Sequence, residues 1–225
     1  MANLSFPDVT GPVLARLGLA PTLGLGNAGM MHLRVRAALR AALPDRPLPL
    51  IRVLGHHSQV FDVMQAREPA DPDLRVRVHL GEDGERADPL AYQAPPLAPG
   101  PRYNAVTAAA LGPVLEALLP GAAPLRHSTA APAGLPGGYP VRISGGSVAL
   151  DLPPGLSEPD AIAFNERLAA GDGVHRIDAD GTVHLTDRCR RAVAGIAPDL
   201  ADPIAVDDLA VRAARLDAVL AAAAG

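Results

Sequence analysis

Two hairpin patterns constrain the fold of this 225-residue chain more than any other feature of the sequence. Pro140–Leu152 carries Gly145-Gly146 at its centre, and Val174–Leu185 carries the turn-forming run Asp178–Gly181. Apolar, β-branched runs on either side of a short glycine-containing turn are typical of β-hairpins. Predicted helices lie between these hairpins without alternating strictly with strands. The pattern therefore predicts an α+β fold, with a mixed or antiparallel sheet covered by helices and no complete Rossmann domain.

Apolar periodicity and capping residues predict the remaining elements. The predicted helices are Val13–Leu17, Met30–Leu43, Tyr103–Leu119, Ser157–Ala170, Thr186–Ile196 and Asp202–Ala224. Additional strands are predicted at Leu50–Leu54, Leu74–Leu80 and Leu125–Thr129. We expect one domain over 1–225, made of a linker-like segment 1–29, a body 30–200 and a C-terminal helix in 201–225.

The basic residues exclude several kinds of chemistry, because all 20 are arginine and lysine is absent. Without a lysine amine the chain forms no Schiff base, pyridoxal-phosphate site or P-loop. The single Cys189 excludes an intramolecular disulfide and a Cys-rich zinc site. A formal net charge of -4 argues against a nucleic-acid partner. No apolar run reaches the ~18 residues of a membrane span, and no leader pattern opens the chain, so we expect a cytoplasmic protein.

A glycine-rich stretch, Gly24-Leu-Gly-Asn-Ala-Gly29, matches the spacing of the dinucleotide-binding fingerprint. That motif requires a strand before it and an acidic residue at the end of the next strand. Here Pro21 weakens the strand, and Gly55 and His56 stand where the acid is needed. We therefore expect no nicotinamide cofactor to bind this chain alone. The start of the following helix remains a weak anion-binding candidate through Asn27, Gly29 and His32.

Two adjacent histidines, His56 and His57, follow a predicted strand and a glycine. A histidine at the end of a strand is well placed for acid–base catalysis, since its pKa lies near neutral pH. Neighbouring side chains on extended backbone point in opposite directions, so only one of the two faces a given cleft. The alternative is that one histidine packs in the core while the other is solvated. No ligand-spaced cluster of histidines and carboxylates predicts a metal site.

Two further segments carry candidate substrate-binding residues. Arg102 and Asn104 open a predicted helix, where a guanidinium could hold a carboxylate, or where Asn104 serves simply as a cap. Tyr139 and Arg142 follow Gly137-Gly138 at the start of a hairpin, where side chains either face a cleft or only pack. We assign Tyr139, with the two histidines, to catalysis, and Arg102, Asn104 and Arg142 to substrate binding.

Several short segments together resemble the C-terminal domain of saccharopine-dehydrogenase-like NAD(P) oxidoreductases. They are Ser5–Leu14, Gly18–Thr22, Gly24–Asn27, Gly55–His57, Leu135–Ile143 and Asp172–Val183. The resemblance implies a bacterial substrate-binding and dimerisation domain that holds a small amino or keto acid. It also implies a homodimer and, because the Rossmann domain is missing, a separate nucleotide-binding subunit that would supply NAD(P).

Two other hypotheses stay open at the level of sequence. The chain is either a cofactor-independent cyclase, isomerase or hydrolase that uses the same histidines and arginines, or a structural partner subunit without an active site. A neighbouring gene for a lone Rossmann domain would favour the oxidoreductase hypothesis over both.

Overall fold

The fold is known from a computed structural model that describes residues 1–4 and 8–224. Residues 5–7 belong to the predicted linker and to the Ser5–Leu14 motif, and they lie outside the described residues, as does Gly225.

The main sheet has five strands in the order β1-β2-β6-β7-β8. Their bounds are β1 Ala2–Asn3, β2 Leu23–Gly24, β6 Leu125–Ala130, β7 Gly138–Ser144 and β8 Ser147–Leu150. β1 and β2 are parallel, whereas all other neighbours in the sheet are antiparallel. The β7–β8 turn has positive φ at both Gly145 and Gly146, which explains why two glycines stand there. The predicted hairpin is confirmed.

A second sheet contains β3 (Ile51–Leu54), β4 (Arg77–Leu80) and β5 (Glu85–Arg86), all antiparallel. A single bridge between Gly55 and Gly138 links the end of β3 to the start of β7. This bridge places the segment after β3 beside the main sheet. The two predicted histidines stand directly after it.

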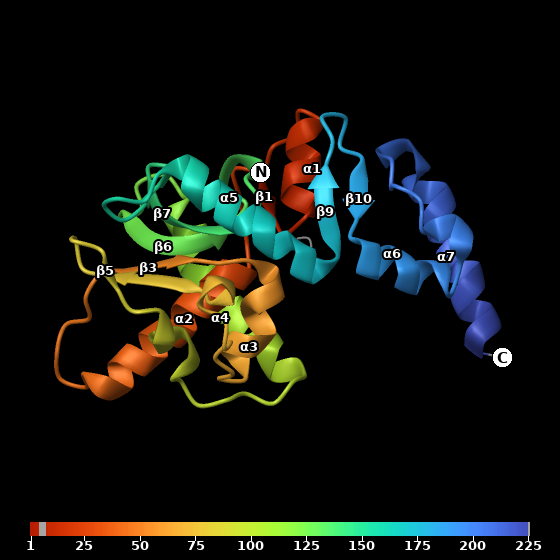
Figure 1. The fold of residues 1–225 in the computed structure, drawn as a ribbon. Helices are drawn as coiled ribbons and strands as arrows, with labels where there is room; N and C mark the ends of the chain where they lie inside the picture. Colours follow the sequence, from red (N-terminus) through yellow and green to blue (C-terminus); the bar gives the residue numbers. More distant parts are fainter. Residues whose placement is uncertain (5–7, 225) are drawn as a thin grey trace.

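The third sheet is the second predicted hairpin, formed by β9 (Val174–Ile177) and β10 (Val183–Leu185). It lies beside α1 (Thr10–Arg16), away from the other two sheets (Figure 1). Two helices follow it, α6 (Asp187–Ala194) and α7 (Leu209–Ala224). The mixture of antiparallel sheets with non-alternating helices confirms the α+β class.

Four helices pack against the two larger sheets. They are α2 Asn27–Ala42, α3 Val60–Met64, α4 Pro101–Ala117 and α5 Glu158–Leu168. In Figure 1, α2, α3 and α4 lie on one side of the strands, and α5 lies on the other. Ser157 caps α5 by accepting the N–H of Asp160, as its sequence predicts.

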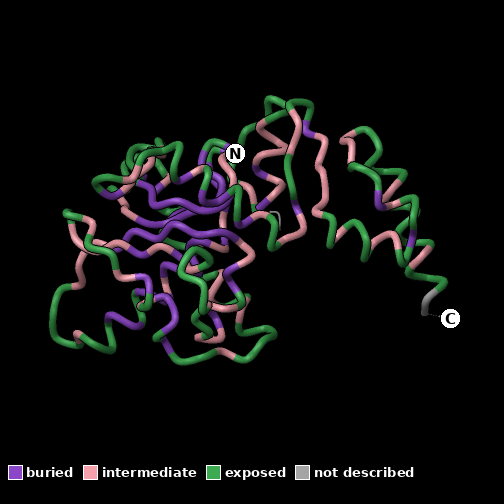
Figure 2. The backbone as a smooth tube through the Cα atoms, in the orientation of Figure 1, coloured by how far each residue is buried: buried purple, intermediate pink, exposed green. Residues whose placement is uncertain are grey.

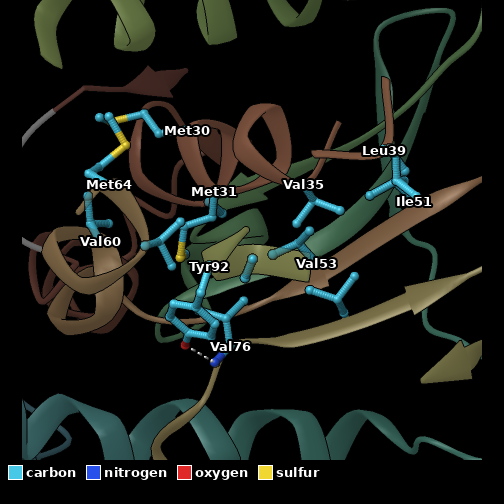
Figure 3. Packing of buried hydrophobic residues seen from close by; sticks show 14 residues of the cluster. Met30, Met31, Val35, Leu39, Ile51, Val53, Val60, Met64, Val76 and Tyr92 are labelled. Carbon is cyan, nitrogen blue, oxygen red and sulfur yellow. Dashed lines mark hydrogen bonds between the residues drawn. The ribbon is translucent and has the colours of Figure 1, made fainter. Parts of the chain in front are cut away.

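The largest apolar cluster lies between α2, α3, β3 and β4 (Figure 3). Met31 and Val35 of α2 meet Val53 of β3, and all three are fully buried. Tyr92 completes the cluster, and its hydroxyl accepts the backbone N–H of Val76 at 3.0 Å. Because few aromatic residues are available, the core is built mostly from Val, Met, Leu and Ala side chains.

Two smaller clusters complete the core. One joins β2, α4 and β7 through Leu23, Val114 and Val141. The other joins α5 to the β3–β7 junction through Phe164 and Tyr139. All buried members of the three clusters lie between residues 23 and 168, so the described chain beyond them contributes little to the core, as the mostly exposed tube of Figure 2 shows.

Two expectations about the elements need correction, and three short strands were not predicted. The C-terminal helix begins at Leu209 rather than Asp202, because Ile204 pairs with Val183 and extends the third sheet instead. The strand expected at Leu74–Leu80 begins at Arg77, because Leu74 is the last residue of a 3-10 helix, Pro72–Leu74. Short strands β1, β2 and β5 have too few residues for periodicity to reveal them.

Candidate functional site

Asp8 connects two segments that the sequence analysis treats separately. Its carboxylate accepts the side-chain N–H of Asn27 at 2.7 Å and the backbone N–H of His57 at 2.8 Å. Asp8 is buried, and these two bonds compensate for the loss of water around its charge. The start of α2 is therefore fixed against the loop after β3.

A second carboxylate, Asp172, meets both predicted histidines. His57 Nδ1 lies 2.8 Å from Asp172 Oδ2, and His56 Nδ1 lies 3.6 Å from the same oxygen. Asp172 ends the 3-10 helix η5 (Ala169–Asp172) directly after α5. Ser58 strengthens this contact, because its hydroxyl donates to the carbonyl of Leu168 at 3.0 Å. We call Asp8, His56, His57 and Asp172 the His–Asp cluster.

Local backbone geometry fixes the tautomer expected for His56. Its side chain caps the 3-10 helix η1 (His57–Gln59), and its Nδ1 accepts the backbone N–H of Ser58 at 3.2 Å. In the neutral ring the proton is then assigned to Nε2. Burial lowers the pKa of His56, while the carboxylates of Asp8 and Asp172 act in the opposite direction. A neutral His56 at neutral pH follows, with a hydrogen-bond donor at Nε2.

His57 has the complementary arrangement. When its Nδ1–H donates to Asp172, the basic lone pair of the neutral ring is on Nε2. A carboxylate that orients one imidazole nitrogen and leaves the other basic is the arrangement used in general acid–base catalysis. Asp172 thus orients His57, and the described linings of the pocket and of its neighbouring cavity include His56 but not His57.

A pocket of ≈ 460 Å³ opens next to the His–Asp cluster, within the size range of small-molecule sites. It lies between α1, the turn at residues 132–136, α5 and β9. Its apolar lining includes Pro12, Ala15, Leu135, Pro136, Ile162 and Val174, and its charged or titratable lining residues are Arg16, Glu166, His175 and Arg176. A small inner cavity shares five residues with this pocket, namely Pro12, Pro136, Ala169, Val174 and Ile177. The inner cavity reaches Asp8, His56 and Asp172.

Contacts across the pocket explain its shape. A side chain at Gly181 in the β9–β10 turn would meet Val13 and Arg16, so this hairpin packs directly on α1. Arg176 on β9 is held by Asp178 at 3.0 Å and by His184 at 3.1 Å. The pocket is therefore bounded by elements that are distant in sequence and adjacent in space.

The structure brings together three of the predicted site residues and separates the others. Asn27, His56 and His57 meet at Asp8 and Asp172. In contrast, Arg102, Asn104 and Arg142 are exposed and are not among the described residues that line the pocket. Arg102 and Asn104 lie in the first turn of α4, and Arg142 is on the exposed side of β7, between buried Val141 and Ile143.

Tyr139 is fully buried and lies in the apolar cluster with Leu54 and Phe164. Burial raises the pKa of its phenol, and the Asn165 side chain opposes this effect. Because no described pocket lining includes Tyr139, the structure gives it a packing role next to the Gly55–Gly138 bridge. The bridge still connects it to His56 through the backbone.

The predicted weak anion-binding site at the start of α2 already has a negative group beside it, the carboxylate of Asp8. Asn27 donates to Asp8, whereas Gly29 allows close packing of α2 on Ser128 and Ala110. His32 is buried and stacks on His127 with ring centroids 4.2 Å apart. The structure therefore places Gly29 and His32 in the packing between α2 and β6.

Sequence reasoning missed the acidic partners and the arginines at the pocket. Asp8 lies 49 residues from His57, and Asp172 lies 115 residues from it. No local spacing marks such pairs, so only the fold reveals them. Arg16 and Arg176 are likewise ordinary surface positions in the sequence.

Among the described residues, no group of three histidine, cysteine or acidic side chains is arranged to hold a metal ion. The helices in the described ranges are also too short or too polar to cross a membrane. Comparisons with protein-family models, with curated proteins and with solved structures each find no match.

Proposed function

We propose that the pocket binds a small organic acid and that the His–Asp cluster transfers a proton to or from it. The observation that carries this proposal is a cavity of ≈ 20 Å³, lined by His56 and Asp172, that shares five of its lining residues with the pocket. Arg16 and Arg176 provide guanidinium groups on the pocket wall, and guanidinium is the side chain best suited to hold a carboxylate.

The proposed chemistry needs only groups of this chain. Asp172 orients the imidazole of His57, while His56, which lines the small cavity, donates a hydrogen bond from Nε2 to an oxygen that gains negative charge. This combination favours a proton-transfer enzyme of the isomerase type. The substrate-holding half of a two-subunit oxidoreductase, which would take NAD(P) from a partner, would use the same pocket for its amino or keto acid.

Carboxylate recognition is tested by titrating the protein with small keto and amino acids and with their uncharged amides, using isothermal calorimetry. We expect an acid to bind at least about 10-fold more tightly than its amide. Arg16→Ala and Arg176→Ala should each weaken binding by roughly 10-fold, because each removes a charged hydrogen-bond partner. Arg102→Ala and Arg142→Ala serve as controls and should leave the affinity unchanged. Equal binding of acid and amide would contradict the proposal.

Proton transfer is tested by NMR, through exchange of the α-proton of a bound acid in deuterated water. Asp172→Asn should reduce the exchange rate by about 100-fold, since it removes the carboxylate that orients His57 and lines the small cavity. Glu166→Gln, on the pocket wall but outside the cluster, should change the rate far less. An acid that binds without any enzyme-dependent exchange would refute the catalytic role and leave only binding.

A further inference from the structure

The pocket lies between α1, α5 and β9, which are neighbours in Figure 1, and its lining residues fall into three groups. The charged or titratable group is exposed and marks the mouth of the pocket; its members are Arg16, Glu166, His175 and Arg176. A second group is shared with the inner cavity, which His56 also lines. The third group contains Leu135 and Ile162, which line the pocket but not the inner cavity. We call Leu135 and Ile162 the apolar wall.

The apolar wall is supported by the core. Leu135 and Ile162 are half-buried, and both pack against the cluster that contains Tyr139 and Phe164. The part of each side chain that this cluster leaves uncovered lines the pocket. The wall therefore presents apolar surface from which a ligand can displace water, and covering such surface favours binding.

The backbone next to the wall is held in a strained conformation. Ala131 and Ala133, just before Leu135, have positive φ values of 40° and 53°, which alanine rarely adopts. Contact with α1 maintains this conformation, since a Cβ at Gly134 would lie 2.5 Å from the Cβ of Ala15. The wall is thus in position before a ligand arrives, so little binding energy is lost in ordering it.

The size of the inner cavity limits which part of a ligand can enter it. At ≈ 20 Å³ it has room for about one water molecule. Only an oxygen atom or a group of similar size fits beside His56 there. The rest of a ligand must occupy the pocket of ≈ 460 Å³.

We propose that the site selects 2-keto acids with an aliphatic side chain. This inference rests on the proposed function and names its substrate class. A 2-keto acid carries three groups on one carbon: the carboxylate for the arginines at the mouth, the keto oxygen for the inner cavity, and the side chain for the apolar wall. A second carboxylate at the end of the side chain would lose water against Leu135 and Ile162 without gaining a partner there, which opposes binding.

Isothermal calorimetry with straight-chain 2-keto acids of three to six carbons tests this selectivity. Each added CH2 group should tighten binding by about 4-fold, the usual gain when one such group leaves water. A six-carbon 2-keto acid that ends in a second carboxylate should bind at least about 10-fold more weakly than the six-carbon acid without it. Equal affinity along the series would overturn the selectivity while leaving carboxylate recognition intact.

The amides of the same series separate a failure of this inference from a failure of the proposed function. Amides that bind more weakly than the acids, but gain affinity by the same factor for each CH2 group, support both. Amides that bind as tightly as the acids with the same gain would contradict carboxylate recognition and retain the role of the wall. Absence of binding in both series would overturn both.

Substitution of the wall tests which residues provide the selectivity. Ile162→Ala should weaken binding of the six-carbon acid by about 5-fold and of the three-carbon acid by less than about 2-fold. Leu152→Ala is the matched control, because Leu152 packs against the same cluster but is not among the described residues that line the pocket. It should leave the whole series unchanged.

Ile162→Val removes a single methyl group and repeats the test with a smaller effect on folding. It should weaken binding of the six-carbon acid by about 2-fold. Urea unfolding checks that each variant is folded under the conditions of the titration. A dependence on chain length that is the same in both Ile162 variants as in the unaltered protein would overturn the assignment of the wall.

Discussion

At the residue scale, the buried carboxylate of Asp8 and the side chain of Asp172 organise the candidate site. Each joins segments that are far apart in sequence, and each compensates its charge with N–H donors or an imidazole. A buried acid of this kind is costly without such partners. The residues that hold the site together are therefore the acids, although the histidines are what the sequence makes conspicuous.

Buried histidines should make the stability depend on pH. Burial lowers the pKa of His32, with His127 and Arg36 acting in the same direction, and burial also lowers the pKa values of His56 and His127. In the unfolded chain each titrates near its usual ~6.5, so below this pH the unfolded state binds protons that the folded state excludes. As the pH drops below 6.5, each of these buried histidines should lower the free energy of unfolding by up to about 1.4 kcal/mol for every pH unit.

Urea unfolding at several pH values between about 7.5 and 5 measures this effect. His32→Gln should make the decrease shallower, because it removes one of the groups that must stay neutral. His175→Gln, at an exposed position, should leave the slope unchanged. A free energy of unfolding that stays constant over this range would contradict the prediction.

At the scale of elements, the junction of β3 and β7 depends on close backbone approach. A Cβ at Gly138 would lie 2.3 Å from the Cβ of Ala28 and 2.9 Å from the carbonyl oxygen of Gly55. The neighbouring atoms belong to α2 and to backbone, so they cannot move aside without disturbing the bridge. This junction also places His56 beside the main sheet.

Gly138→Ala should therefore destabilise the protein by about 1–3 kcal/mol, the usual cost of overpacking. Gly195→Ala is the control: Gly195 is exposed at the end of α6 with a φ of -68°, and an added Cβ would meet only the carbonyl oxygens of Ala192 at 3.4 Å and Arg191 at 3.6 Å. That change should be neutral or stabilising by up to about 1 kcal/mol, since alanine favours the helix. The prediction fails if chemical denaturation gives both variants the same stability.

Element prediction succeeded where a segment has its own periodicity or turn chemistry. Both hairpins and the long helices α2, α4 and α5 follow from local patterns. The prediction that the last helix begins at Asp202 was wrong. The pairing of Ile204 with Val183 outweighs the helix propensity of the residues around Ile204.

At the scale of the whole molecule, the chain has a densely packed body and a peripheral C-terminal part. The three apolar clusters use residues 23–168, while α7 touches the rest through Arg212, which donates to the carbonyl of Leu200, and Arg215, which pairs with Asp199. Stability of the body should therefore not depend on α7.

Deletion of residues 209–225 should change the thermal midpoint by less than about 3 °C, because few buried contacts are lost. Scanning calorimetry measures this midpoint, and a large loss of thermal stability would show that α7 belongs to the core.

The sequence by itself determined the α+β class, the hairpins, the main helices and the histidines as candidates, because each depends on residues close together in the chain. Only the tertiary structure decided which candidates meet. It joined His56 and His57 to Asp8 and Asp172, and it separated Arg102 and Arg142 from them. The reason is physical: a site is formed by contacts between distant segments, and those contacts are set by packing and by the compensation of buried charge, not by local spacing.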